Sequence, residues 1–196
     1  MTENRNIDGK KIMVRDYVFT WSNLISATRV IITIPIIYLH VQNNFQVDIW
    51  ITLLIIYGII SDYLDGLTAR LRDEITEVGK LLDPIADKVM AVVLFAYTVW
   101  LGLVPLWFFI VAVIRDLLIV GGSIYIKKKF GKVAMSIMSG KISVNVLALY
   151  WLSVFFFPEY ITVHFYLMII SLAIMLISFL DYYNRFNKII KGAEFN

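Results

Sequence analysis

Cysteine is absent from the chain, and charged side chains make up only 17% of its 196 residues. Without cysteine the protein can form neither a disulfide bond nor a thiolate metal site. The scarcity of charge goes with 60% hydrophobic residues and a mean hydropathy of +0.77. Such a composition excludes an ordinary soluble domain and indicates an integral membrane protein. Residues 1–20 contain no long apolar run, so we expect a retained anchor rather than a cleavable signal peptide.

Apolar segments long enough to cross a bilayer recur along the chain. A helix needs roughly 20 apolar residues to cross the hydrocarbon core. The predicted segments are about 22–42, 47–70, 79–101, 104–126, 137–157 and 161–184. The sequence therefore predicts an all-α membrane protein with six transmembrane helices, which form one domain over residues 21–196.

Lysine and arginine gather on one side of these predicted helices. They precede the first helix, follow the sixth, and occupy the connections between the second and third and between the fourth and fifth. The other three connections contain none, so the positive-inside rule places both termini in the cytoplasm. Within the N-terminal segment 1–20, residues 5–19 mix basic and apolar side chains. This pattern favours a basic amphipathic helix on the inner leaflet, with a solvated basic tail as the alternative.

Four aspartates lie in otherwise apolar sequence, where an ionised carboxylate is costly unless it is paired or bound to metal. Asp62 and Asp65 are three residues apart, and Asp83 and Asp87 are four apart. On helices each pair therefore lies on one face. Two such faces brought together make an all-oxygen site for hard divalent cations. Because all four lie near predicted cytoplasmic helix ends, we expect the site to face the cytoplasm.

Two other interpretations of the aspartates are open at this point. They could be buried ion-pair partners of Arg70, Lys80 and Lys88, or they could form the proton relay of a transporter. Four carboxylates next to a glycine and an arginine favour the metal site over both.

The aspartates are part of a longer motif. It reads Asp62-x2-Asp65-Gly66-x2-Ala69-Arg70-x8-Gly79-x3-Asp83-x3-Asp87. At every defined position this motif resembles the signature of the CDP-alcohol phosphotransferases, which are membrane enzymes of phospholipid synthesis. Eight defined residues within twenty-six positions are a specific signal. The six predicted helices agree with that family, so the resemblance covers nearly the whole chain.

The resemblance implies roles for the residues of the motif. Asp62, Asp65 and Asp83 would hold two divalent cations, with Asp87 also reaching one of them. Mg²⁺ is the expected metal and Mn²⁺ the alternative. Asp87 would also be the catalytic general base, and the donor substrate would be CDP-diacylglycerol. The residues that contact this lipid would be Asn23, Asp62, Gly66, Ala69, Arg70, Thr76 and Gly79.

Three cations further along the chain are candidates for binding the acceptor. Arg115 lies within the fourth predicted helix, where an arginine must face the protein interior or a watery cavity. A plain ion pair with the neighbouring Asp116 is the alternative. Lys132 precedes the fifth predicted helix and Lys141 lies at its start. An anionic acceptor would explain three converging cations.

This arrangement resembles the phosphatidylglycerophosphate synthase branch of the family, as does Asn23-x5-Arg29-x5-Pro35 in the first helix. The resemblance implies transfer of a phosphatidyl group to sn-glycerol 3-phosphate, with release of CMP. Arg115, Lys132 and Lys141 would then bind the acceptor phosphate. Inositol phosphate, serine and phosphatidylglycerol are the alternative acceptors.

A divalent-cation carrier is the alternative from another functional class. The outer halves of the predicted helices contain almost no ionisable residue, which disfavours a transport route. The two histidines, His40 and His164, lie near those outer ends and are not expected to bind metal. The sequence thus predicts a multi-pass enzyme of the cell membrane that works among membrane lipids and has no nucleic-acid partner. The family resemblance also implies a homodimer.

Overall fold

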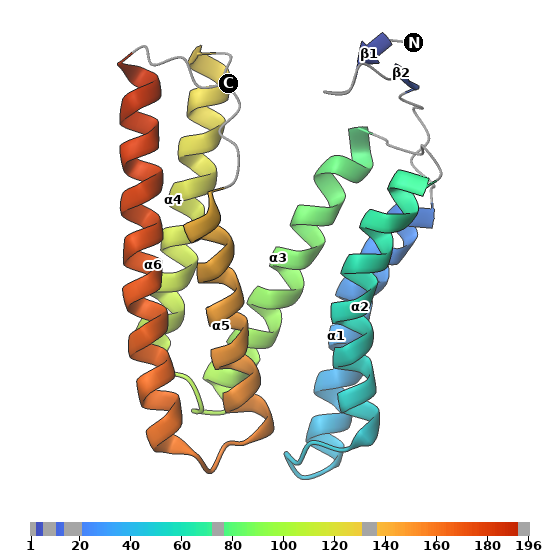
Figure 1. Cartoon of the computed structure of the whole chain (residues 1–196). Coiled ribbons are helices and arrows are strands. Elements are labelled where there is room, and N and C mark those ends of the chain that lie inside the picture. Colours follow the sequence, from blue (N-terminus) through green and yellow to red (C-terminus); the bar gives the residue numbers. More distant parts are fainter. Residues whose placement is uncertain (1–2, 6–10, 14–20, 72–76, 131–136, 192–196) are drawn as a thin grey trace. The chain divides into compact units, whose positions relative to one another are not determined.

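A computed structural model describes residues 3–5, 11–13, 21–71, 77–130 and 137–191, with side chains at 27–61, 86–130 and 137–191. Within these ranges the chain forms six helices and two short strands. The helices are α1 (Trp21–Gln42), α2 (Ile49–Leu71), α3 (Glu77–Trp100), α4 (Leu106–Phe130), α5 (Met138–Phe156) and α6 (Ile161–Ile190), as Figure 1 shows. The predicted helical fold is confirmed, and only α4 and α6 run clearly beyond their predicted ends.

The surfaces of these helices support a membrane protein. Within the described part of the chain, α4, α5 and α6 are long and apolar enough to cross a membrane. α1 and α2 contribute the shorter apolar stretches Ala27–Gln42 and Ile49–Ser61. Large apolar side chains such as Ile161, which is 74% exposed, cover the outside of the helices. Lipid accommodates such a surface and water does not. Six crossings and cytoplasmic termini remain predictions.

The N-terminal segment differs from the prediction. β1 (Glu3–Arg5) and β2 (Lys11–Met13) pair as an antiparallel two-stranded sheet. The amphipathic helix predicted over residues 5–19 is therefore wrong for Arg5 and Lys11–Met13, and the rest of it lies outside the described part of the chain. The sequence between the strands contains Asp8-Gly9, a dipeptide typical of hairpin turns. That local signal outweighs the weak helical pattern.

The chain divides into two units, Met1–Tyr97 and Thr98–Asn196, with the boundary inside α3. In the first unit α1 and α2 pack side by side (Figure 1). α3 contacts α1 through a 2.8 Å hydrogen bond between His40 Nδ1 and the Tyr97 hydroxyl. It approaches α2 at Gly58, where an added Cβ would lie only 2.8 Å from the Met90 side chain. This glycine therefore leaves room for the Met90 side chain of α3 against α2.

Asp48 lies immediately before α2 and caps it. Its Oδ1 accepts a hydrogen bond from the Ile51 N–H at 2.9 Å. The first turn of a helix leaves such donors without intrahelical partners, so the bond stabilises the start of α2. The same bond holds the pKa of the Asp48 carboxyl below its ordinary value.

We expect Asp48→Ala to lower the thermal unfolding temperature at neutral pH. A carboxyl whose pKa is lowered by folding stabilises the protein above its ordinary pKa of about 3.9. That contribution is lost as the pH falls through the lowered pKa. The difference in unfolding temperature between wild type and Asp48→Ala, measured in detergent, should therefore shrink in strong acid. Asp48→Asn keeps an acceptor oxygen without the charge, so it should lower the unfolding temperature less than Asp48→Ala does, and its difference from wild type should also shrink in strong acid. A constant difference for Asp48→Ala would contradict this account.

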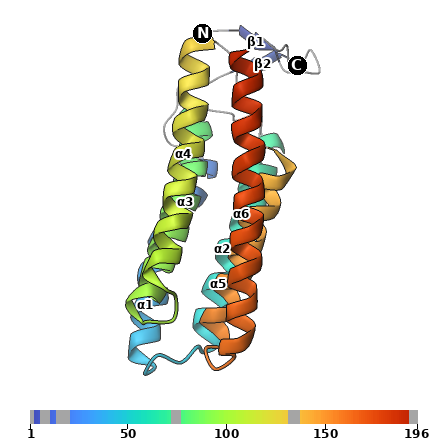
Figure 2. The same ribbon diagram turned by 90° about the vertical axis from the view of Figure 1, so that its left-hand side faces the viewer.

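In the second unit α6 packs against both α4 and α5. Figure 2 shows α6 running alongside α4. Two glycines allow the close approach of these helices. A Cβ on Gly122 of α4 would collide with the Phe186 ring, and one on Gly140 of α5 would lie 2.9 Å from the Tyr182 hydroxyl. α6 is therefore the helix around which this unit is packed.

Two adjacent glycines of α4 provide a matched test of that packing. We expect Gly122→Ala to lower the unfolding temperature, because the new methyl group must displace the Phe186 ring. Overpacking of this kind costs about 1–3 kcal/mol. Gly121 has open space around it, so Gly121→Ala should be neutral or slightly stabilising, since alanine is the better helix former. Equal unfolding temperatures for the two variants would show that Phe186 moves aside without cost.

Candidate active site

The four predicted metal ligands lie on two helices. Asp62 and Asp65 are one turn apart in the C-terminal part of α2, and Asp83 and Asp87 are one turn apart in α3. The structure describes the side chain of Asp87 but not those of the other three aspartates. Among the side chains that are described, no three histidine, aspartate or glutamate residues are placed to hold a metal ion. The two-metal site therefore stays a prediction.

The predicted contacts for CDP-diacylglycerol lie in the same helices. Their positions are Asn23 on α1, Gly66, Ala69 and Arg70 on α2, and Gly79 on α3. The side chains of these residues, and Thr76 as a whole, lie outside the described part of the chain. Asp62, Gly66 and Ala69 are spaced along α2 so that they lie on one face of the helix.

Asp87 is bound by an arginine from another helix. Arg29 Nη1 on α1 donates a hydrogen bond to Asp87 Oδ1 on α3, and the two groups form a salt bridge. The Arg29 side chain is 1% exposed, whereas that of Asp87 is 45% exposed. A buried guanidinium needs a counter-charge because water cannot solvate it. Asp87 is thus anchored by a buried cation while much of its own surface stays accessible.

The residue types at this site fit divalent cations. Carboxylate oxygens are the ligands that Mg²⁺ and Mn²⁺ prefer in proteins. A carboxylate has two oxygens, so a guanidinium bonded to Oδ1 of Asp87 is compatible with a cation at the same group. The arginine contact does not exclude Asp87 from the predicted ligand set.

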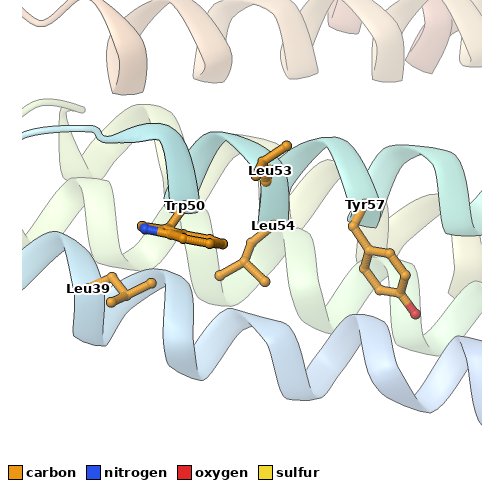
Figure 3. A pocket seen from close by; sticks show the side chains of 5 residues that line it. All are labelled: Leu39, Trp50, Leu53, Leu54 and Tyr57. Carbon is orange, nitrogen blue, oxygen red and sulfur yellow. The ribbon is translucent and has the colours of Figure 1, made fainter.

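An apolar groove also lies in the first unit, between α1 and α2. It has a volume of about 590 Å³ and is lined by Leu39, Trp50, Leu53, Leu54 and Tyr57 (Figure 3). The Tyr57 hydroxyl at one end is 3.0 Å from the Thr28 hydroxyl. Because its lining carries no charged side chain, the groove does not suit a cytidine diphosphate.

Arg115 lies on α4 and makes contact with α6. Its Nη1 donates to Asp116 Oδ1 at 2.7 Å, and its Nη2 donates to Ser178 Oγ at 2.5 Å. The side chain is 11% exposed, and its Nε is buried without a hydrogen-bond partner in the described structure. The ion pair with Asp116, which was the alternative to an anion site, is present. It still leaves Arg115 with an unused donor for an anion.

More buried polar atoms lie around the same stretch of α6. Ser139 Oγ on α5 and Arg185 Nε on α6 are buried without partners among the described residues. Ser178, Tyr182 and Arg185 are spaced so that they share one face of α6. On that face Ser178 contacts α4 and Tyr182 contacts α5. Buried unsatisfied donors are rare in proteins, so each of the two arginines carries a donor that an anion could satisfy.

The other two predicted acceptor residues are placed differently. Lys141 lies in the first turn of α5 with an exposed side chain, and Lys132 lies outside the described residues. Of the three predicted cations, Arg115 is the one that the described structure places among buried polar groups.

Arg29, Ser178 and Arg185 were not predicted as site residues. Arg29 had a signal, because a lone arginine inside an apolar helix needs a buried partner. Ser178 had none, since serine is common wherever membrane helices pack. Arg185 was counted among the basic residues that set the orientation. Its distance of two helical turns from Ser178 could have indicated a shared face.

Comparison with known proteins gives consistent matches. The family model for CDP-alcohol phosphatidyltransferase matches residues 19–177. A CDP-diacylglycerol–glycerol-3-phosphate 3-phosphatidyltransferase of Aquifex aeolicus is 34% identical over 171 residues, which are 82% of this chain and 92% of that relative. One of the same name from Mycoplasma pneumoniae is 40% identical over 91 residues, 46% of this chain and 40% of that relative. A cardiolipin synthase (CMP-forming) of Streptomyces coelicolor is 33% identical over 104 residues, 52% of this chain and 48% of that relative.

Proposed function

The chain belongs to the CDP-alcohol phosphatidyltransferase family, and on this premise we propose that it transfers the phosphatidyl group of CDP-diacylglycerol to sn-glycerol 3-phosphate. Members of the family are membrane transferases of phospholipid biosynthesis and generally depend on divalent cations. The observation that carries the choice of acceptor is the similarity to the Aquifex aeolicus enzyme, which extends over 82% of this chain. The products would be phosphatidylglycerophosphate and CMP.

In the proposed site the carboxylates of α2 and α3 bind the metals. Asp62, Asp65, Asp83 and Asp87 hold two divalent cations, with Mg²⁺ expected and Mn²⁺ as the alternative. When bound, these cations neutralise the pyrophosphate and polarise its phosphorus. Arg70 adds bidentate hydrogen bonds to a phosphate oxygen pair. The remaining contacts with the donor are Asn23, Gly66, Ala69, Thr76 and Gly79.

Asp87 acts as the general base in this proposal. It takes the proton from the acceptor hydroxyl as that oxygen attacks the lipid-side phosphorus. A new phosphorus–oxygen bond forms on one side while the bond to CMP breaks on the other. CMP leaves with the electron pair of the broken bond, and the proton stays on Asp87.

The acceptor phosphate is held by cations of the second unit. Arg115 offers a charge-assisted hydrogen bond from its buried Nε, and Arg185 offers another from the shared face of α6. Lys132 and Lys141 would contribute further positive charge to this proposed site. The two arginine Nε donors without described partners support a phosphorylated acceptor over serine, which carries no phosphate to bind.

A lipid acceptor such as phosphatidylglycerol is the second candidate, because one relative is named as a cardiolipin synthase. Its phosphate is a diester with one negative charge. A phosphate monoester carries about −1.5 to −2 at neutral pH. The two arginines with buried Nε atoms therefore favour glycerol 3-phosphate, and inositol phosphate shares that monoester chemistry.

We place the enzyme in the cell membrane, with its aspartates and both termini on the cytoplasmic side. The support is the gathering of basic residues in the connections on that side. The homodimer that the family resemblance implies stays a prediction.

Release of CMP by the purified protein, with CDP-diacylglycerol and Mg²⁺, tests the proposed function. The acceptors compared are glycerol 3-phosphate, inositol phosphate, inositol, serine and phosphatidylglycerol. We expect release with glycerol 3-phosphate alone. Release with a different acceptor would keep the donor chemistry and replace the acceptor. No release with any of them, together with Mg²⁺ uptake into liposomes, would favour a cation carrier.

A further inference from the structure

Arg29 contacts the residue on which the proposed proton transfer depends. We propose that Arg29 is a positioning residue, whose buried guanidinium holds the Asp87 carboxylate in the orientation that the transfer requires. The inference rests on the proposed function, because it assigns Arg29 a role that acts through Asp87. In this proposal α1 supports the site through Arg29, and no other described side chain of α1 belongs to the predicted site.

The surroundings of Arg29 make it a rigid support. Ile32, Thr33 and Ile36 follow it at helical spacing, so all four lie on one face of α1. Each is buried, with Ile36 0% and Arg29 1% exposed. A guanidinium is planar and presents its donors in a fixed fork, so little freedom is left once its stem is packed. The Arg29 guanidinium therefore has a defined position next to Asp87.

The bond to Asp87 fixes more than one atom. The terminal torsion of an aspartate side chain is broad, so an unsupported carboxylate samples many orientations. With Oδ1 bonded to Arg29 Nη1, the plane of the carboxylate and the direction of Oδ2 are set together. The 45% exposed fraction of Asp87 then gives the acceptor hydroxyl an approach to a group that is already aligned.

The salt bridge lies where three helices meet. Gly58 of α2 is the meeting point, since its Cβ position is approached by both Ile32 of α1 and Met90 of α3. Ile32 and Met90 each follow a member of the salt bridge by one helical turn. Asp62 follows Gly58 by one turn along α2. The Arg29–Asp87 contact thus belongs to the packing that sets α3 against the helix carrying the first metal ligand.

A purely structural role for Arg29 is the competing explanation, and the variants are chosen to separate the two. Arg29→Met removes the charge while keeping an apolar stem, and Arg29→Lys keeps a charge without the planar fork. Tyr97→Phe is the matched control, because it removes a second side-chain hydrogen bond between α1 and α3, the bond to His40, and leaves Asp87 unchanged.

Steady-state kinetics of CMP release give the first readout. For Arg29→Met we expect kcat to fall about 100-fold, the loss typical of a misplaced reacting group, with KM for both substrates unchanged. Arg29→Lys should recover part of this loss, and Tyr97→Phe should keep the wild-type kcat. The double variant Arg29→Met/Asp87→Asn should be no slower than Asp87→Asn alone, because Arg29 acts through Asp87.

Thermal unfolding without divalent cations gives a readout that does not need activity. Arg29→Met should lower the unfolding temperature less in the Asp87→Asn background than in the wild type, because the pair is already weakened there. Additive losses would show that the two residues do not interact in the folded protein and would overturn the proposal.

The kinetic outcomes separate this proposal from the proposed function. Wild-type CMP release together with an unchanged kcat in Arg29→Met would overturn the role of Arg29 and leave the function standing. The same holds if Tyr97→Phe loses as much kcat as Arg29→Met, since general loosening of α1 would then explain both. If Arg29→Met fails to fold, Arg29→Lys carries the test, and a wild-type kcat in that variant would count against the proposal. A wild type that releases no CMP with any acceptor would remove the proposed function, and the role of Arg29 with it.

Discussion

Asp87→Asn is expected to lower the rate of CMP release by about 10²- to 10⁴-fold, which is the range that a positioned general base contributes. Asparagine has the same size and can still accept a hydrogen bond from Arg29, so the packing of α1 against α3 should survive. It cannot take a proton from the acceptor hydroxyl. Because Asp62, Asp65 and Asp83 are unchanged, Mg²⁺-dependent binding of CDP-diacylglycerol should persist. The measurement pairs single-turnover CMP release with direct binding of the labelled lipid.

The matched control for this variant is Asp181→Asn. Asp181 is an exposed aspartate of α6 with no place in the proposed site, and its replacement should leave turnover and lipid binding unchanged. Near-normal turnover in Asp87→Asn would remove Asp87 as the base. A loss of lipid binding along with turnover would instead make Asp87 chiefly a metal ligand.

Arg115→Ala is expected to raise the KM for glycerol 3-phosphate by about 10- to 150-fold. A hydrogen bond to a charged group is worth about 1.5–3 kcal/mol, and each 1.4 kcal/mol is about a factor of ten in affinity. In the proposed site this contact is made to the acceptor phosphate, which does not react, so binding would be lost equally before and during the transfer. The KM for glycerol 3-phosphate should therefore rise while kcat stays close to the wild-type value. Initial rates at varied glycerol 3-phosphate, with CDP-diacylglycerol saturating, measure the effect.

Two further variants in the second unit serve as a control and a comparison for Arg115→Ala. Lys128→Ala removes an exposed cation from the end of α4 and should leave the KM unchanged. Ser178→Ala removes the partner of Arg115 Nη2 and should raise the KM less than Arg115→Ala does, because the guanidinium remains. An unchanged KM in Arg115→Ala would assign Arg115 to its ion pair with Asp116 alone.

The helices could be predicted from the sequence because burial in lipid requires long apolar runs. The predicted segment 22–42 differs from α1 by one residue at its start, and 137–157 differs from α5 by one residue at each end. α4 and α6 continue past their predicted ends, to Phe130 and Ile190. Their last turns carry lysines, which a hydropathy pattern excludes although a helix accommodates them. Hydropathy marks the apolar part of a helix rather than its hydrogen-bonded length.

The contacts of the site were harder to predict than its residues. The motif identified Asp87 by its spacing, yet its salt bridge with Arg29 depends on which faces of α1 and α3 meet. Apolar helices carry little periodic signal for that choice, because lipid and protein interior are equally apolar. The contact between Arg115 and Ser178 could not be predicted for the same reason, because it depends on which faces of α4 and α6 meet. The strands at the N-terminus were not predicted, because the mixture of basic and apolar side chains over residues 5–19 indicated an amphipathic helix.

Arg29 also has a consequence for how the chain enters the bilayer. During synthesis α1 leaves the ribosome before α3, so its arginine reaches the membrane before its counter-ion exists. An arginine near the centre of a helix opposes insertion by about 2.5–3.5 kcal/mol. With the predicted six crossings, α1 would either enter the hydrocarbon at that cost or stay at the interface until α3 arrives. The salt bridge would in this way tie the integration of the first helix to that of the third.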